Sequence, residues 1–402
     1  MAAAVQAAPQ MSPAQLNAFL RTVILRGGQI GKTMYPPAVD MWQQLNPLAA
    51  GTIQPGSVQT IQLRNVGLVK RLVLEIAGTI TAGASTTQTL TPWGLANIIS
   101  NVQFIDLGNN TRINSGGWHL NAVSSVKRRR VYGAAYTSDT PNGYGNVNNR
   151  TMYAPTTISA TASTPFRLML EIPFVKDNVD LRGAIFADVT NAVMQVQITF
   201  NPNMFVSSSA DATLAVYQSG GSDLAALSGV TVQANQNYLD QLPRDPASGS
   251  PYLPPLDIGT AYLLNTTSSG LPVAGQDNGT AFVNARQYES LVFGYDNNGT
   301  LNVNGSDINY VALRSANFTN ILQYDGPMLG LMDREVLGDD LPKGMHYLSY
   351  RDRPINTDQY GNMQFVFNPS SVGGSGANVL FGWEAYGIIG QVNQGGSLPM
   401  GR

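Results

Sequence analysis

The chain has 402 residues, which is room for two domains of about 200 residues, each long enough to bury a hydrophobic core. Its net charge is −2 and only 12% of its residues are charged, about half the usual share of roughly 25%, so no global field attracts it to nucleic acid or to an acidic surface. It contains no cysteine, which excludes disulfides, thiolate nucleophiles and cysteine-based metal sites.

A surface this short of charge must be built from Asn, Thr, Ser, Gln and Gly. Neutral polar groups cost less to desolvate than charges do, which favours a protein that covers much of itself with copies of itself. An ordinary secreted β protein with a neutral surface is the alternative. No stretch approaches the 18 uninterrupted apolar residues of a membrane-spanning helix, and the first eight residues lack the basic and apolar regions of a secretory signal.

The first predicted element is a helix over residues 12–26, within an N-terminal arm that covers residues 1–45. Ser12 is a good N-cap, Pro13 suits the first helical position, and Gln15 completes a capping box. The apolar stripe of this helix consists of Leu16, Phe19, Leu20, Val23 and Ile24. Such a stripe fits a membrane surface or the underside of the protein's own first domain, and the residues alone leave both open.

After the arm the pattern changes to β structure. Short runs rich in Val, Ile, Leu and Phe predict strands at residues 57–63, 69–80, 98–107, 166–172 and 193–200. In the last run Met194, Val196 and Ile198 alternate with polar residues, and Gly/Asn-rich turns separate the runs. Many short strands with few helices predict an all-β chain of antiparallel sandwiches or jelly rolls.

The second half of the chain repeats features of the first. Asp139-Thr140-Pro141 precedes Tyr144-Gly145-Asn146, and Asp352-Arg353-Pro354 precedes Tyr360-Gly361-Asn362. A second pair of motifs begins at Ala96-Asn97 and Ala316-Asn317, and the offsets between copies lie between 213 and 220 residues. Near-constant offsets predict two similar domains in tandem. Five prolines within residues 243–255 mark the linker, so we expect domains at 46–245 and 246–390, followed by a tail at 391–402.

Few residues suit catalysis or metal binding. The two histidines, His119 and His346, each stand beside an aromatic residue and are interpreted as hydrogen-bonded structural groups. Asp296-Asn297-Asn298-Gly299 is interpreted as a hairpin turn because the later ligands of a calcium loop are missing. The densest acidic cluster would suit a glycosidase, although Arg334 and Lys343 beside it favour a solvated loop or a subunit contact; it comprises Asp333, Glu335, Asp339 and Asp340.

The only run of charges consists of Lys127, Arg128, Arg129 and Arg130. It would suit phosphate, either in lipid headgroups or in nucleic acid. Because no aromatic residue is interleaved with it, an exposed loop or an ion pair with a neighbouring subunit is the favoured interpretation. We expect no sequence-specific contact with nucleic acid.

These features together resemble a known family, the major capsid proteins of tectiviruses, which are tailless bacteriophages with a membrane inside the protein shell. The resemblance is collinear over roughly residues 12–370. It is carried by Ser115-Gly116-Gly117-Trp118-His119-Leu120, the segment 137–147, Tyr238-Leu239-Asp240-Gln241-Leu242-Pro243, Asp307-Ile308-Asn309-Tyr310, Ala316-Asn317-Phe318, Pro342-Lys343-Gly344, Arg351-Asp352-Arg353-Pro354 and Tyr360-Gly361-Asn362.

The resemblance implies two eight-stranded jelly rolls side by side, in a homotrimer that imitates a hexagonal tile of an icosahedral capsid assembled in the host cytoplasm. It implies an N-terminal helix near the internal viral membrane, contacts with vertex (penton) and minor capsid proteins, no enzymatic activity and no cofactor. The rival interpretation is a jelly-roll spike that binds carbohydrate or a receptor. The four tryptophans of the chain are scattered along the sequence, which argues against a cluster of aromatic residues that binds glycans. They are Trp42, Trp93, Trp118 and Trp383.

Overall fold

The structure is a computed structural model. It describes residues 39–48, 53–132, 152–176, 181–187, 193–207, 213–240, 260–270, 272–301, 305–316, 320–337, 344–350, 354–374 and 376–388. The predicted N-terminal helix with Leu16, Phe19, Leu20, Val23 and Ile24 lies outside these residues, and so does the whole linker at 243–255.

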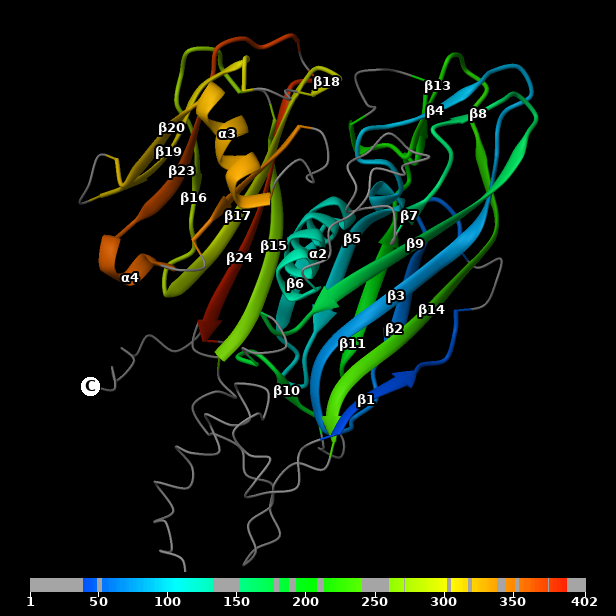
Figure 1. The fold of residues 1–402 in the computed structure, drawn as a ribbon, viewed down its shortest axis with the longest axis horizontal. Helices are drawn as coiled ribbons and strands as arrows, with labels where there is room; N and C mark the ends of the chain where they lie inside the picture. Colours follow the sequence, from blue (N-terminus) through cyan, green and yellow to red (C-terminus); the bar gives the residue numbers. More distant parts are fainter. Residues whose placement is uncertain are drawn as a thin grey trace, which may run out of the picture.

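The first half of the chain forms a β sandwich of two four-stranded sheets, drawn from blue to green in Figure 1. One sheet has the order β1-β14-β3-β9 and the other β2-β11-β5-β6. The strands are β1 (Val39–Gln44), β2 (Val58–Gln62), β3 (Leu68–Thr81), β5 (Ile99–Ile105), β6 (Thr111–Ser115), β9 (Ser163–Pro173), β11 (Gln195–Phe200) and β14 (Ala226–Asp240). Strand β1 thus falls within the arm that was predicted to precede the first domain.

Short strands extend this sandwich. Strand β7 pairs with β9, β10 pairs with β3, and four further strands form a small sheet in the order β12-β13-β4-β8. Their bounds are β4 (Gln88–Leu90), β7 (Met152–Tyr153), β8 (Thr157–Ile158), β10 (Ile185–Phe186), β12 (Phe205–Val206) and β13 (Tyr217–Ser219).

The second half repeats the sandwich, drawn from yellow to red beside the first in Figure 1. Its sheets have the orders β15-β24-β17-β21 and β16-β23-β19-β20, with β18 and β22 also paired to β17. The strands are β15 (Thr260–Gly270), β16 (Asn278–Ala281), β17 (Arg286–Asn297), β18 (Thr300–Leu301), β19 (Ile308–Ser315), β20 (Leu322–Asp325), β21 (Met345–Ser349), β22 (Ile355–Asn356), β23 (Met363–Pro369) and β24 (Asn378–Ile388).

The two halves share one topology. If the eight main strands of each half are numbered in chain order, both have one sheet ordered 1-8-3-6 and another ordered 2-7-4-5. In both, a helix connects the fifth strand to the sixth: α2 (Gly117–Tyr132) follows β6, and α3 (Gly326–Leu337) follows β20. The predicted double jelly roll is therefore confirmed. Each sandwich, with its own large cluster of buried apolar side chains, is called a barrel below.

The equivalence reaches single residues. A Cβ on Gly117 would lie 2.1 Å from the carbonyl oxygen of Ala96, and one on Gly326 would lie 2.1 Å from that of Gly305. Gly326 follows Gly117 by 209 residues, and Gly305 follows Ala96 by the same number. The first residue of β19 likewise follows the first residue of β5 by 209. The motif alignment from sequence was therefore wrong in register: Ala96-Asn97 precedes β5, whereas Ala316 follows β19. The duplication is real, but Ala96 and Ala316 are not equivalent positions; Asp139-Thr140-Pro141 and Tyr144-Gly145-Asn146 lie outside the described residues.

Local predictions for the strands agree with the structure. Met194, Val196 and Ile198 are fully buried, and the polar residues between them are half-buried. Asp296 to Gly299 form the predicted turn, where Asn298 and Gly299 have φ of 57° and 87°, as a tight hairpin requires. Helices α2 and α3, by contrast, were not indicated by the sequence, and neither was the short α4 (Thr357–Tyr360).

An ionic network ties the outer sheet of the second barrel together. Asp277, just before β16, accepts hydrogen bonds from the Tyr310 hydroxyl at 2.5 Å and the Asn368 amide at 2.8 Å. It also pairs with the Arg314 guanidinium. These bonds, first that from Tyr310, lower the pKa of Asp277 to about 2.

We predict that Asp277→Asn lowers the free energy of unfolding at pH 7, and that this loss shrinks as pH falls toward 2. A carboxyl with a depressed folded pKa stabilises the fold above its ordinary pKa and stops doing so as it is protonated. The side chain is 37% exposed, so screening limits the effect to at most about 1 kcal/mol. Urea unfolding at pH 7 and pH 2.5 measures it; an equal loss at both values would contradict the prediction.

Candidate functional site

The contact between the two barrels is the most extensively built site in the described residues. Strand β6 of the first barrel pairs in parallel with β15 of the second, through Leu264 opposite Ile113 and Asn265 opposite Asn114. This pairing joins a sheet of each barrel into one ten-stranded sheet. The Gly116 amide also donates to the Thr266 hydroxyl at 3.1 Å. Because hydrogen bonds of the backbone cross the junction, they fix how the two barrels lie relative to each other.

Helix α2 fills the space between the barrels (Figure 1). Its inner residues, including Leu120 and Val123, belong to the core of the first barrel. Its other side packs against the second barrel in a separate apolar cluster, which comprises Trp93, Trp118, Ala122, Val126, Val292, Met345, Tyr347 and Leu380. The helix is therefore buried on both sides along its first turns.

Aromatic rings of the first barrel press against glycines of the second. Trp93 and Trp118 are stacked with ring centroids 5.3 Å apart. A Cβ on Gly294 would lie 2.7 Å from the Trp93 ring, and one on Gly382 would lie 2.5 Å from the His119 ring. These close approaches are possible because glycine leaves the sheet surface bare. The sequence had suggested four scattered tryptophans, and the structure brings two of them together.

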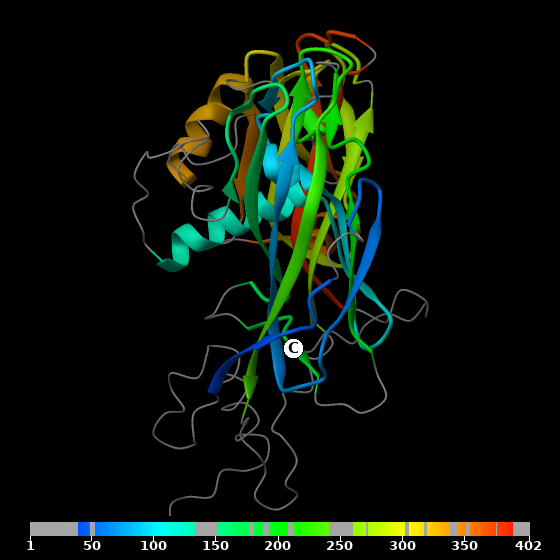
Figure 2. The same cartoon turned by 90° about the vertical axis from the view of Figure 1, so that its right-hand side faces the viewer.

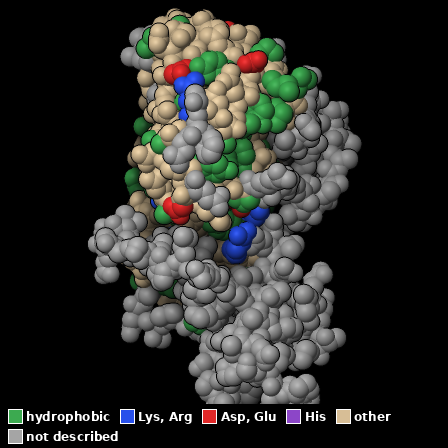
Figure 3. All heavy atoms as spheres, turned by 90° about the vertical axis from the view of Figure 1, so that its left-hand side faces the viewer, with side chains coloured by type: hydrophobic (Ala, Val, Ile, Leu, Met, Phe, Trp, Pro, Cys, Tyr) green, Lys and Arg blue, Asp and Glu red, His purple; other side chains and the backbone are tan. Residues whose placement is uncertain are grey.

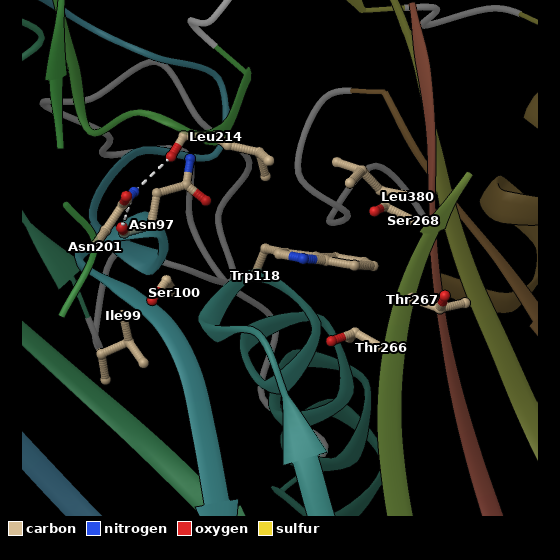
Figure 4. Close-up of a pocket in the computed structure, with 10 residues that line it drawn as sticks. All are labelled: Asn97, Ile99, Ser100, Trp118, Asn201, Leu214, Thr266, Thr267, Ser268 and Leu380. Atoms are coloured by element: carbon tan, nitrogen blue, oxygen red, sulfur yellow. Dashed lines mark hydrogen bonds between the residues drawn. The ribbon is translucent and has the colours of Figure 1, made fainter. Parts of the chain in front are cut away.

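A cavity of about 230 Å³ lies above this cluster, between the barrels. Figure 4 shows the Trp118 ring reaching across it toward β15, with Asn97 and Asn201 on the side of the first barrel. The Asn201 amide donates to backbone oxygens of Asn97 and Leu214 at 2.9 and 2.7 Å. The described residues that line it are neutral, with no carboxylate or histidine among them, so these residues offer no acid–base chemistry.

Charges also cross the junction. The Lys176 ammonium, just after β9, lies 2.6 Å from Glu289 Oε2 on β17, and the Glu289 side chain is fully buried. Burial raises the pKa of Glu289, although the bond to Lys176 opposes this. The Arg182 guanidinium lies over the Tyr386 ring at 4.6 Å. Two cations of the first barrel thus meet a carboxylate and an aromatic face of the second.

Both histidines are structural, as predicted. His119 on α2 is fully buried, and its Nδ1 lies 2.8 Å from the Ser115 hydroxyl. His346 on β21 pairs with Asp333 of α3 at 2.8 Å, and Asp333 also accepts from the Tyr347 amide at 2.8 Å. Asp333 therefore fastens α3 to the sheet. Nothing in the sequence indicated this pair, because the two residues come together only when the chain folds and α3 packs beside β21.

The charge run and the acidic cluster are placed only in part. Lys127, Arg128, Arg129 and Arg130 lie on the last turns of α2, which corrects the interpretation as a loop; their contact with phosphate or a subunit stays a prediction. Asp333 and Glu335 lie on α3, so the interpretation of that part as a loop was also wrong. Asp339 and Asp340 lie outside the described residues, so a glycosidase pair has no described geometry.

Other functional classes find no support in the residues that the structure describes. They contain no group of three or more His, Asp or Glu side chains placed to hold a metal ion. Among their helices, none has the length and apolarity needed to cross a membrane. Figure 3 shows few charged side chains on the outer face of the second barrel and several groups of hydrophobic ones. Such a surface suits contact with other protein.

Comparison with known proteins matches both halves of the chain to the same protein family. The model for the P3 major capsid protein N-terminal part matches residues 1–242, and that for the C-terminal part matches residues 259–398. Major capsid protein P3 of Enterobacteria phage PRD1 is 32% identical over 333 residues, which are 82% of this chain and 83% of the relative. These matches support a shell protein over a spike or a glycosidase.

Solved structures share the fold. The crystal structure of the STIV MCP has a TM-score of 0.61 at 10% identity, covering 89% of this chain and 100% of that one. The quasi-atomic model of the PBCV-1 virus capsid has a TM-score of 0.55 at 10% identity, covering 88% and 94%. With both halves matched and the double barrel shared, the chain belongs to the family of P3 major capsid proteins, which are structural proteins of a bacteriophage capsid and not enzymes.

Proposed function

We propose that three copies of this capsid protein form a tile with six similar sides, and that these tiles pack in a hexagonal net around an internal viral membrane. The observation that supports this most directly is the repeated topology. Each chain contributes two barrels with the same strand order, held side by side by β6, β15 and α2. Three such chains in a ring present six equivalent barrels.

The interfaces of such a tile should be of the obligate kind, larger than roughly 2,000 Å². The sparse charge of the chain supports this, because neutral surface is cheaper to desolvate on assembly. Sedimentation of the purified protein should give the mass of three 43.0 kDa chains, and electron microscopy should show hexagon-like particles. A stable monomer at micromolar concentration would refute the proposal.

Some finer assignments follow from the resemblance and others from the residues alone. We propose that the stripe Leu16, Phe19, Leu20, Val23 and Ile24 faces the inner side of the shell near the membrane. We further propose contacts with vertex and minor capsid proteins, and a role for Lys127, Arg128, Arg129 and Arg130 in binding phosphate or a neighbouring subunit. The division into domains at 46–245 and 246–390 also remains a proposal.

A further inference from the structure

The cavity between the barrels has a buried floor and an exposed rim. Asn97, Trp118 and Asn201 form the floor and are buried, whereas Thr267 and Ser268 of β15 are exposed and form part of the rim. In Figure 2 the teal helix α2 begins among the strands, and its far end projects from one side of the molecule. Trp118 is the second residue of this helix, so it belongs to the inner end.

The Asn97 side chain turns an acceptor without a partner toward the cavity. Its amide nitrogen donates to the carbonyl oxygens of Thr213 at 2.9 Å and Ala215 at 2.8 Å. Two carbonyl partners fix which end of the amide is the nitrogen, so the other end is Oδ1, which Figure 4 shows turned into the cavity. Asn97 is only 3% exposed, yet none of the described residues donates to this oxygen.

Trp118 offers a donor and a ring face. It is 6% exposed, and its indole N–H has no acceptor among the described residues. Trp93 stacks on the ring but does not line the cavity, so the opposite face of the Trp118 ring is the one turned to the cavity. Figure 4 shows this ring edge-on, lying across the space between the barrels. Because buried polar groups are normally hydrogen-bonded, the floor calls for a partner that both accepts and donates.

The rim adds two hydroxyl groups from the second barrel. The hydroxyls of Thr267 and Ser268 make no hydrogen bond to any described residue. Asn201, by contrast, uses its amide to hold the backbone oxygen of Asn97 at 2.9 Å, so it keeps the floor in place. The groups open to a ligand are therefore one acceptor, one donor, two hydroxyls and one aromatic face.

These groups define the class of molecule that fits. The described lining carries no charge, so an ion would lose its water there without gaining a counter-charge. A hydroxyl group donates and accepts at once, and the negative face of an aromatic ring attracts C–H groups. The volume of about 230 Å³ equals that of roughly seven water molecules at about 30 Å³ each and is smaller than the roughly 300–1,000 Å³ of pockets for drug-sized ligands. It therefore has room for one small ring.

We propose that this cavity binds a neutral polyol ring of the size of a single sugar unit. Its C–H face lies on the Trp118 ring, its inner hydroxyls bond Asn97 Oδ1 and Trp118 Nε1, and its outer hydroxyls bond Thr267 and Ser268. All these partners belong to one chain, so the site does not depend on the proposed trimer. A single recessed pocket also differs from the exposed aromatic cluster of a glycan-binding spike, and the shell function is unaffected.

The indole N–H signals test the site directly. In protein whose tryptophan nitrogens are isotopically labelled, the four tryptophans give four N–H signals, and the signal absent from Trp118→Phe belongs to Trp118. Methyl α-glucoside should shift this signal and saturate it in the millimolar range. Trp118→Phe keeps a ring but loses the donor, so saturation transfer from protein to glucoside should report binding about 3–10-fold weaker. A Trp118 signal that the glucoside does not move would show that water alone fills the cavity, and would overturn the proposal.

A filled rim separates binding in the cavity from binding elsewhere. Ser268→Phe places a large side chain at an exposed position of the rim and should abolish the shift of the Trp118 signal. Thr231→Phe is the matched control, because Thr231 on β14 is also exposed but does not line the cavity; it should bind the glucoside as the wild type does. Equal shifts in Ser268→Phe and the wild type would contradict the placement of the ligand.

Two related probes test the chemical class. Glucuronate carries a carboxylate on the same kind of ring, and cyclohexanol has a ring with one hydroxyl. Both should bind the wild type at least about tenfold more weakly than methyl α-glucoside, the first because its charge finds no partner and the second because it leaves the floor unsatisfied. Equal affinity for the three probes would overturn the assignment to neutral polyols.

Discussion

Replacing Trp118 with alanine is expected to lower the free energy of unfolding by about 3–5 kcal/mol, the usual cost of truncating a buried tryptophan. The Trp118 side chain is 6% exposed, stacks on Trp93 and packs in the cluster that joins the two barrels. The adjoining cavity of about 230 Å³ would be enlarged, and the surrounding backbone has little freedom to collapse, because Gly294 and Gly382 already bring the second sheet against the rings.

The loss should appear as weakened coupling between the barrels. Calorimetry at matched protein concentration should show one transition for the wild type and a broadened or split transition for Trp118→Ala. Trp118→Phe is the control, since it keeps an aromatic ring against Trp93 and should recover much of the stability. If Trp118→Ala costs less than about 1 kcal/mol, an amount typical of surface positions, the cluster does not hold the barrels together.

The double fold could be predicted from the sequence because two independent signals agree on it. Alternation such as that of Met194, Val196 and Ile198 indicates one buried face per strand, and the collinear resemblance to tectivirus capsid proteins implies two jelly rolls. The correspondence between positions of the two barrels could not be found from the sequence, because the equivalent residues that mark it are glycines at the starts of helices. Gly117 and Gly326 are set by close approach to a carbonyl oxygen, a constraint that leaves no motif around it.

There is a physical reason why helices α2 and α3 were not predicted from the sequence. A surface helix shows a polar face, and its amphipathic period reveals it. The first turns of helix α2 lie between the two barrels and are buried on both sides, so that period is absent there. Helix α3 has apolar Met328 and Leu331 outside as well as Leu329 inside, which blurs the period in the same way. The junction itself was beyond prediction, since Lys176 and Glu289 are far apart in the chain and share no local pattern.

Replacing Lys176 with methionine is expected to destabilise the protein strongly at pH 8 and only slightly at pH 5. Glu289 is fully buried, and Lys176 is its salt-bridge partner at 2.6 Å. Burial raises the pKa of Glu289, Glu384 nearby raises it further, and Lys176 and Arg182 oppose the rise. Removing Lys176 therefore raises this pKa more, and a folded chain at high pH must hold an unpaired buried charge or keep a proton bound.

The sign follows from linkage. A carboxyl whose folded pKa lies above its unfolded value favours folding at low pH, and this contribution is lost as pH rises through the folded pKa. The cost of Lys176→Met should therefore grow with pH, by at most about 1.4 kcal/mol per unit, toward the roughly 3–5 kcal/mol found when a buried pair loses one partner.

The double variant Lys176→Met, Glu289→Gln removes both charges and should recover most of this stability at pH 8, because a neutral pair needs no counter-ion. Urea unfolding of the three proteins at pH 5 and pH 8 measures the difference, and equal pH profiles for the single and double variants would show that Glu289 does not depend on Lys176 across the junction.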